Sequence, residues 1–242
     1  MAIVFIHGVP DTHHLWDSIR DRLTDRQTIA LSLPGFGCAR PPGFSATKEA
    51  YADFAIDALE PIGAPVDLVG HDWGANIVQR VVSLRPDLVR SFACGSGIVD
   101  AEYTWHDVAQ QWQTPGVGEQ MMELMTPEVM TASLEASGVP AGIAAETAAR
   151  IDEEMRRSIL ALYRSAINIG AEWQPGVEQV RRPALILWGA NDPFADVRFA
   201  HRLTERVRGE FRLLPGCGHW WPVEAPDAVV PALRRFWDSC GE

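Results

Sequence analysis

The sequence lacks the features that several protein classes require. Among its 242 residues there are four cysteines, and none stands in the C-x-x-C spacing of zinc sites and redox pairs. The apolar run at the N-terminus, residues 2–6, is too short for a signal peptide or a membrane span. We therefore expect a cytoplasmic protein with no metal site, no disulfide framework and no membrane segment.

Basic residues are also scarce. The chain has 21 Lys and Arg against 32 Asp and Glu, which gives a formal net charge of −11. Because such an acidic surface repels phosphate groups, we expect no nucleic-acid partner. The hydrophobic share of 47% is that of a globular protein, and the length fits one large domain or a domain with an insertion.

Short apolar runs alternate with segments of helical spacing. The runs predict buried strands at residues 2–6, 28–33, 66–69, 91–94, 184–188 and 211–214. The helical segments lie at residues 15–23, 48–59, 75–84, 199–207 and 228–237. Apolar strands that alternate with helices indicate an α/β fold, in which helices cover both faces of a mostly parallel sheet.

One stretch interrupts this alternation. Residues 100–173 contain no strand candidate but several Ala-rich helical windows. We predict that they form a helical lid, inserted into an α/β core made of residues 1–99 and 174–242. Four methionines of this stretch are expected to fill gaps between its helices rather than to line a ligand site: Met121, Met122, Met125 and Met130.

The segment GHDWG, residues 70–74, has the context of a nucleophile elbow because it follows a predicted strand and precedes a predicted helix. Its outer glycines permit a sharp turn, which exposes the central Asp72 at the carboxyl end of the sheet. The N-terminus of the following helix favours a negative charge there. A simple helix cap is the alternative, but the coincidence of glycines, strand and helix favours a nucleophile.

An aspartate at this position implies a particular chemistry. A carboxylate with a pKa of about 4 is already ionised at neutral pH, so it needs no base before it attacks. Such a nucleophile suits displacement at an sp³ carbon that carries a leaving group. The product is an alkyl ester of Asp72, which a water molecule and a base must then hydrolyse.

His219 is the predicted base, and Asp192 is its predicted partner. Asp192 lies in the segment WGANDPF, residues 188–194, and His219 in the segment GCGHWW, residues 216–221. Each follows a predicted strand, and the chain order of nucleophile, acid and histidine suits a catalytic triad. Asp100, which follows the preceding strand, is the second candidate for the acid.

The segment HGVP, residues 7–10, ends the first predicted strand. The backbone N–H groups of Val9 and Trp73 are candidates for an oxyanion hole, and His7 is expected to support the loop. Other histidines have no carboxylate or cysteine at metal-binding spacing, so we interpret them as ordinary packed or solvated residues: His13, His14, His106 and His201.

These four segments together resemble the α/β-hydrolase superfamily, in its Asp-nucleophile branch of epoxide hydrolases and haloalkane dehalogenases. The resemblance covers nearly the whole chain and implies a triad of Asp72, Asp192 and His219 that needs no cofactor. Family members usually carry two further strands before the HG segment, where this chain starts. The resemblance therefore implies a sheet of about six strands, with residues 28–33 at one edge.

The resemblance also implies roles within the lid, where epoxide hydrolases hold two tyrosines that donate protons to the epoxide oxygen. The segment LYRS, residues 162–165, resembles the second of these sites and gives that role to Tyr163. The segment QWQTPGV, residues 111–117, resembles the first, but Gln111 stands where a tyrosine is expected. A hydrogen bond from Gln111 or Trp112 can replace it, and Tyr103 is another candidate.

The favoured function is therefore an epoxide hydrolase that acts on small or medium apolar epoxides. A haloalkane dehalogenase with the same triad stays open, because Trp73 and a lid tryptophan, Trp105 or Trp112, offer indole N–H donors to a halide. A non-catalytic small-molecule binder on the same fold is the third hypothesis. The expected partner is a small apolar substrate, and the sequence leaves a homodimer open.

Overall fold

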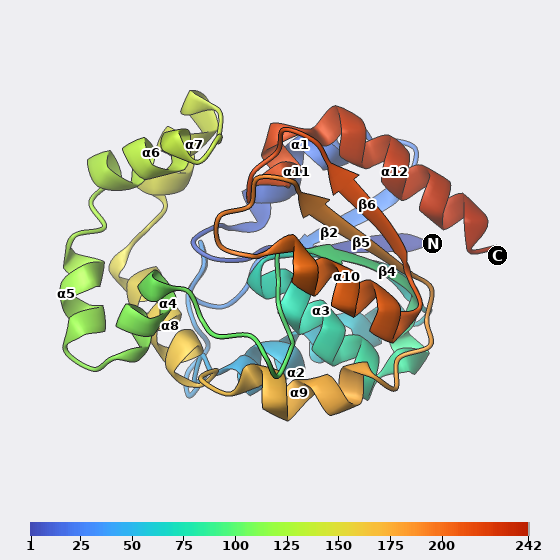
Figure 1. Cartoon of the computed structure of the whole chain (residues 1–242), viewed down its shortest axis with the longest axis horizontal. Coiled ribbons are helices and arrows are strands. Elements are labelled where there is room, and N and C mark those ends of the chain that lie inside the picture. The colour runs from blue at the N-terminus through green and yellow to red at the C-terminus, as the bar shows by residue number, and fades with distance from the viewer. Residues whose placement is uncertain (242) are drawn as a thin grey trace.

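A six-stranded sheet runs through the middle of the molecule (Figure 1), in a computed structural model that describes residues 1–241. The strand order is β2-β1-β3-β4-β5-β6, and every neighbouring pair is parallel. The predicted α/β class with a mostly parallel sheet is confirmed. The strands are β1 (Ala2–Ile6), β2 (Gln27–Leu31), β3 (Val66–His71), β4 (Val89–Gly95), β5 (Ala184–Gly189) and β6 (Glu210–Leu214).

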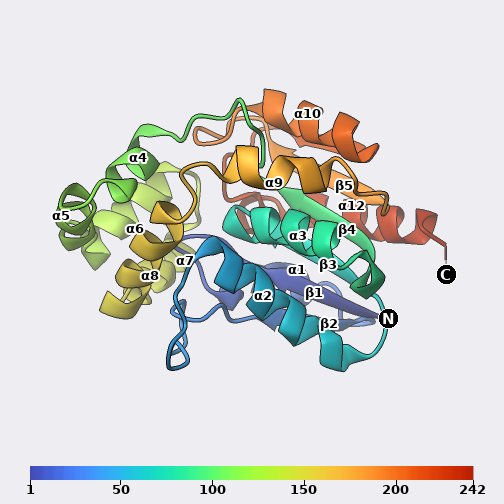
Figure 2. The same ribbon diagram turned by 90° about the horizontal axis from the view of Figure 1, so that it is seen from below.

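The side chains of each central strand alternate between two apolar cores. In β1, Val4 and Ile6 face one core, whereas Ile3 and Phe5 face the other. Helices cover both faces, which explains why these strands are buried along nearly their whole length (Figures 1 and 2). The first core contains residues of α2 (Lys48–Leu59), α3 (Trp73–Leu84), α9 (Ile169–Val177) and α10 (Val197–Val207), and the second contains residues of α1 (Asp17–Arg20), α11 (Trp221–Glu224) and α12 (Pro226–Ser239).

The two outer strands differ from the prediction of buried strands. In β2 no side chain is fully buried, and in β6 only Leu214 is. An outer strand has one neighbour instead of two, so it loses part of its cover. The expectation that residues 28–33 lie at an edge is confirmed. The helix predicted at residues 15–23 is shorter, because a 3₁₀ turn (His13–Trp16) precedes α1.

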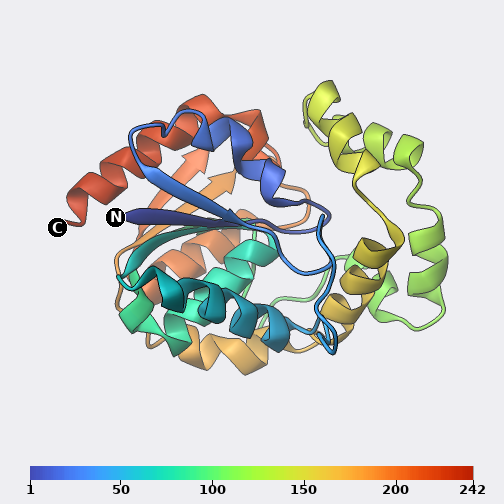
Figure 3. The ribbon, with the colours of Figure 1, turned by 180° about the vertical axis from the view of Figure 1, so that it is seen from behind.

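The residues between β4 and α9 form a group of helices beyond the carboxyl ends of the strands (Figures 1 and 3). Helix α9 crosses residue 173 and packs on α3, so the division of the chain at residues 100 and 173 stays a prediction. None of the helices within residues 1–241 is long and apolar enough to cross a membrane. The group comprises α4 (Asp107–Gln113), α5 (Val117–Glu123), α6 (Pro127–Ala136), α7 (Ala141–Ala149) and α8 (Glu153–Arg164).

The strand order reverses between β1 and β3. The chain adds β2 on one side of β1, then places β3 on the other side and continues outward to β6. In a parallel sheet, the loops that leave two such strands turn to opposite faces and open a crevice at the carboxyl edge, where ligands bind. The loops after β1 and β3 carry the HGVP and GHDWG segments.

Glycines bring α3 closer to the sheet than a side chain would allow. A Cβ atom on Gly74 would lie 2.0 Å from the carbonyl oxygen of Ile6 in β1. A Cβ atom on Gly70 would lie 2.4 Å from the carbonyl oxygen of Gly74. Because both obstacles are backbone atoms, they cannot rotate away. The two glycines therefore fix where α3 begins relative to β1 and β3.

Replacement of Gly74 by alanine is expected to lower the free energy of unfolding by about 3 kcal/mol, at the upper end of the usual cost of overpacking. Urea denaturation of the purified variant measures this. Gly142→Ala in α7 is the matched control, since within residues 1–241 a Cβ there meets no atom within 4 Å. It should raise stability by up to about 1 kcal/mol. Equal stabilities of the two variants would contradict this packing argument.

Candidate active site

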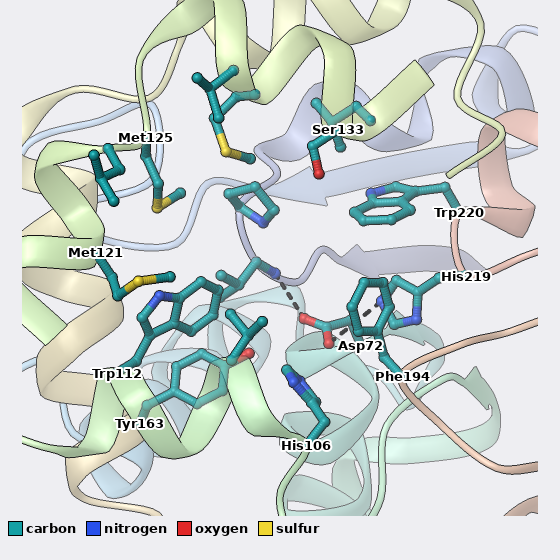
Figure 4. A pocket seen from close by; sticks show the side chains of 17 residues that line it. Asp72, His106, Trp112, Met121, Met125, Ser133, Tyr163, Phe194, His219 and Trp220 are labelled. Atoms are coloured by element: carbon teal, nitrogen blue, oxygen red, sulfur yellow. Dashed lines mark hydrogen bonds and ion pairs between the residues drawn. The ribbon is translucent and has the colours of Figure 1, made fainter. Parts of the chain in front are cut away.

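Asp72 occupies a strained turn between β3 and α3. Its φ of 53° and ψ of −120° lie in a region that residues with a side chain rarely adopt. The Asp72 N–H donates to the Gly95 carbonyl at 3.0 Å, and the Ala75 N–H donates to the Asp72 carbonyl at 2.9 Å. These bonds hold the turn, so the carboxylate projects beyond the sheet into a cavity (Figure 4).

The loop after β1 contacts this carboxylate directly. The Val9 N–H donates to Asp72 Oδ1 at 2.7 Å. A Cβ atom on Gly8 would lie 2.2 Å from the same oxygen, so only glycine fits before Val9. Trp73 is the first residue of α3, where backbone N–H groups have no acceptor within the helix. The structure thus places both predicted oxyanion-hole residues next to Asp72, and their role stays a prediction.

The other two predicted triad residues meet Asp72 in a row. His219 Nε2 lies 3.6 Å from Asp72 Oδ2, and His219 Nδ1 lies 2.9 Å from Asp192 Oδ2. The fully buried Asp192 side chain also accepts the N–H groups of Phe194 and Ala195, at 3.0 and 3.1 Å. Asp192 is thereby fixed in position and can hold the His219 ring toward Asp72.

Mutual charges dominate the electrostatics of this row. Burial lowers the pKa of His219, but the carboxylates of Asp192 and Asp72 outweigh burial and raise it to about 10. Burial raises the pKa of Asp72, but His219 and the Val9 N–H outweigh it and hold that pKa below its usual value. An ionised Asp72 therefore faces a protonated His219. If Asp72 lost its charge, the pKa of His219 would fall.

His7 supports the loop that carries Val9. Its Nδ1 donates to the Gly8 carbonyl at 2.9 Å, and its Nε2 accepts the Leu33 N–H at 3.3 Å. Burial lowers the pKa of His7 to about 4, so the ring is neutral and both nitrogens are occupied. Such a ring can hold a loop but offers no free nitrogen for proton transfer.

Asp100, the second candidate for the acid, lies elsewhere. Its carboxylate is 2% exposed and forms ion pairs with Arg202 at 2.7 Å and Arg206 at 2.5 Å. Both arginines belong to α10, so Asp100 ties the start of the loop after β4 to that helix. Of the two carboxylates, Asp192 and not Asp100 contacts His219.

Asp72 opens into an apolar cavity of about 270 Å³ (Figure 4). Its floor is formed by Asp72 and His219, and residues of α4, α5, α6 and α8 contribute to its other walls. The expectation that the methionines fill gaps between helices rather than line a ligand site is wrong for Met121, Met125 and Met130, because α5, α6 and the segment between them turn these side chains toward the cavity. The lining includes Val9, Asp72, His106, Val108, Trp112, Met121, Met125, Met130, Leu134, Tyr163, Phe194, His219 and Trp220.

Tyr163 and Trp112 line this cavity together. The Tyr163 ring packs edge-on against Trp112, with 4.9 Å between ring centroids, and against Trp73, with 5.4 Å. Burial, reinforced by the charge of Asp72, raises the pKa of Tyr163 well above its usual value. The hydroxyl therefore keeps its proton until a strong base forms beside it.

Two predicted substrate-binding residues do not reach the cavity. Gln111 is exposed, because it lies about 100° around α4 from the inward-facing Trp112. Tyr103 packs against Trp105 and Phe199 and lines a neighbouring hollow instead. The structure therefore corrects the prediction that Gln111 or Tyr103 replaces the missing lid tyrosine at this cavity.

Two other residues lie at or near the site although no sequence motif predicted a role for them. His106, interpreted as an ordinary histidine, lines the cavity with Asp72. Asp11 is 3% exposed and accepts the Trp220 Nε1–H at 3.0 Å; burial raises its pKa to about 7. The spacing of His106 from the motifs carries no information, since only the packing of α4 brings it near Asp72.

The ionisable side chains of the site contact one another in pairs and do not converge on a common point, as metal ligands would. His219 lies between Asp72 and Asp192, and His7 bonds only to backbone. In the part of the chain that the structure describes, no group of three or more His, Cys, Asp or Glu could hold a metal ion.

The row of charges predicts how His219 titrates. Asp192→Asn removes a charge that raises the pKa of His219, so that pKa should fall by about one to three pH units. NMR titration of ring-labelled histidines measures the change, and the spectrum of His219→Gln assigns the signal. Asp100→Asn is the control, and it should leave the pKa of His219 unchanged. The same pKa in both variants would contradict the pairing with Asp192.

Comparison with known proteins identifies relatives of this chain. The family described as "Alpha/beta hydrolase family" matches residues 3–232. The chain is 25% identical to epoxide hydrolase A of Mycobacterium tuberculosis in an alignment that is 296 positions long. The alignment covers 97% of this chain and 89% of that protein. It is also 25% identical to epoxide hydrolase 3 of Mus musculus in an alignment that is 262 positions long. That alignment covers 97% of this chain and 70% of the mouse protein.

Solved structures share the fold. The haloalkane dehalogenase DbeA from Bradyrhizobium elkani USDA94 superimposes with a TM-score of 0.79. The match covers 99% of this chain and 90% of that one, at 20% sequence identity. A likeness at this identity concerns the arrangement of strands and helices.

Proposed function

The chain belongs to the alpha/beta hydrolase family, and we propose that it is an epoxide hydrolase that converts small apolar epoxides to diols. One observation carries the proposal: a carboxylate at the nucleophile position, a histidine base and a protonated tyrosine line the same apolar cavity. Two relatives of the chain, both epoxide hydrolases, support it. Helices α4–α8 act as the lid of this cavity.

In the first step, Asp72 attacks an epoxide carbon. The Val9 N–H holds Oδ1, so Oδ2 is the oxygen that forms the new bond. As that bond forms, the carbon–oxygen bond of the epoxide breaks and leaves an alkoxide. Tyr163 donates its proton to the alkoxide, which is the stronger base, and water later restores that proton. The product of this step is an alkyl ester of Asp72.

In the second step, water hydrolyses the ester. Esterification removes the charge of Asp72, so the pKa of His219 falls, and the ring releases its proton to water and can act as a base. His219 then accepts a proton from the attacking water, Asp192 stabilises the resulting imidazolium, and the hydroxide attacks the ester carbonyl. Negative charge develops on Oδ1, which the Val9 N–H already contacts and to which we expect the Trp73 N–H to donate as well. Collapse of this intermediate breaks the bond between the ester carbonyl carbon and the substrate oxygen. That oxygen takes the proton of the new Asp72 carboxyl group, which completes the diol and leaves Asp72 ionised again.

The cavity favours an uncharged, apolar substrate. Its walls carry methionine, leucine, valine and aromatic side chains, and no Lys or Arg is among the lining residues. The charge of His219 is already paired with Asp72 and Asp192, so an acidic substrate would meet these carboxylates without a Lys or Arg to compensate its own charge. A volume of about 270 Å³ suits a small or medium-sized molecule.

A haloalkane dehalogenase is the second candidate function, and one indole group favours it. The Nε1–H group of Trp112, which lines the cavity, is buried and has no hydrogen-bond partner within residues 1–241. A buried donor without a partner is costly, and a leaving halide would accept such a bond. Trp105 has no such capacity, because its Nε1–H donates to the Ala166 carbonyl at 2.9 Å.

The covalent intermediate can be observed directly. In His219→Gln the ester of Asp72 should accumulate, because alkylation proceeds while hydrolysis lacks its base. Mass spectrometry after incubation with an apolar epoxide measures the adduct and its position. His201→Gln, at an exposed histidine, is the control and should show no accumulation.

Isotope labelling tests the same intermediate in the wild-type protein. A single turnover in ¹⁸O-water should place label in the Asp72 carboxylate, because water attacks the enzyme carbonyl rather than the substrate carbon. Label confined to the diol would contradict the nucleophilic role of Asp72. If no adduct or product forms with epoxides or bromoalkanes, the protein is not an enzyme of either kind and a binding role replaces the proposal.

Tyr163→Phe separates the two candidate activities. An alkoxide needs a proton as it leaves, whereas bromide needs only N–H donors, so the variant should slow alkylation by epoxides at least about 100-fold. Its alkylation by bromoalkanes should change far less. Rapid-quench measurement of the Asp72 adduct gives both rates, and Tyr103→Phe, outside the cavity, is the control. Unchanged epoxide rates in Tyr163→Phe would exclude Tyr163 as the acid.

A further inference from the structure

We propose that His106 is a second catalytic residue, whose Nε2–H donates a hydrogen bond to the oxygen that Asp72 displaces from the substrate. The inference rests on the proposed epoxide hydrolysis and adds a residue to it. Figure 4 shows the His106 ring directed toward the Asp72 carboxylate, in the cavity that Tyr163 also lines. With Gln111 in solvent, the cavity otherwise has one hydroxyl donor near Asp72.

The fold fixes which nitrogen of His106 carries the proton. His106 is the N-terminal cap of α4, and its Nδ1 accepts the Ala109 N–H at 3.3 Å. A ring nitrogen that accepts an N–H has no proton of its own, so a neutral His106 must carry its proton on Nε2. The cap therefore makes Nε2 a hydrogen-bond donor.

The surroundings of His106 keep that donor neutral and in place. Burial lowers the pKa of His106, so the ring is uncharged at neutral pH. Its ring packs against Phe194, with 5.3 Å between centroids, and against Trp105, with 6.4 Å. Among the described residues, none forms a hydrogen bond with Nε2, so the donor is available to a ligand.

A second donor has a defined task in the first step. As Asp72 Oδ2 bonds to carbon and the epoxide bond breaks, the oxygen gains a full negative charge and receives one proton, from Tyr163. His106 keeps its own proton and offers a hydrogen bond to the same oxygen, which lowers the energy of the charge as it develops. A neutral imidazole suits this role, and an apolar cavity strengthens such a bond.

A purely structural role is the competing explanation, since a cap on α4 would by itself account for His106. Two substitutions separate the roles. His106→Asn places Oδ1 where Nδ1 lies and keeps the cap, but it has no N–H at the position of Nε2. His106→Gln places an amide N–H near that position and weakens the cap.

The measurement is the rate of Asp72 alkylation by styrene oxide, followed by mass spectrometry after rapid quench, together with the thermal unfolding midpoint. We expect His106→Asn to alkylate about 10- to 100-fold more slowly than the wild type, the effect of one hydrogen bond to a charged group. Its unfolding midpoint should be unchanged. His106→Gln should alkylate at a rate close to the wild type although its midpoint is lower.

The opposite pattern, with fast alkylation in His106→Asn and slow alkylation in His106→Gln, would show that His106 acts only as the N-terminal cap of α4. Equal rates in the two variants, whether fast or slow, would overturn the proposal as well. Failure of the proposed function is recognised separately, because the wild type would then form no Asp72 adduct with the epoxide. A wild type that reacts while the two variants behave alike refutes only the role of His106.

Discussion

The contact between the Val9 N–H and Asp72 Oδ1 joins two loops that leave neighbouring strands, β1 and β3, in opposite directions. It requires a backbone turn that Asp72 adopts only under strain and a glycine at position 8. The close approach of α3 to β1 at Gly74 supplies the rigidity that such a turn needs. The same sheet also places the remaining site residues. Asp192 and His219 lie in the loops that follow β5 and β6, and these strands pair in parallel with the rest of the sheet.

The junction also shapes the electrostatics. His219 lies between two carboxylates, and each of them raises its pKa. The arrangement suits the proposed two-step reaction, because it stabilises the ionised form of Asp72 before the proposed attack and would make His219 more acidic once Asp72 is esterified. Residues of α4, α5, α6 and α8 form an apolar cavity above these charges, and apolar surroundings strengthen electrostatic interactions.

Much of this arrangement follows from local sequence. The apolar runs identified all six strands, because strands covered by helices on both faces are rich in apolar residues. The edge position of residues 28–33 followed from the family resemblance. Asp72, Asp192 and His219 were predictable because each directly follows a strand, and the carboxyl ends of parallel strands meet at one edge of the sheet. The burial of the outer strands β2 and β6 was predicted less well, since burial of an edge strand depends on its neighbours rather than on its own residues.

Contacts between distant segments decided the rest. Sequence order left Asp100 and Asp192 as rivals, and only the folded chain shows Asp100 paired with two arginines of α10 while Asp192 contacts His219. The motifs indicate nothing about which face of α4 turns inward, so Gln111 was expected at the cavity and His106 was not. The sequence alone determined the sheet and the residues at its carboxyl edge, because both depend on local patterns. Tertiary packing determined the cavity walls, because the orientation of short helices depends on everything they pack against.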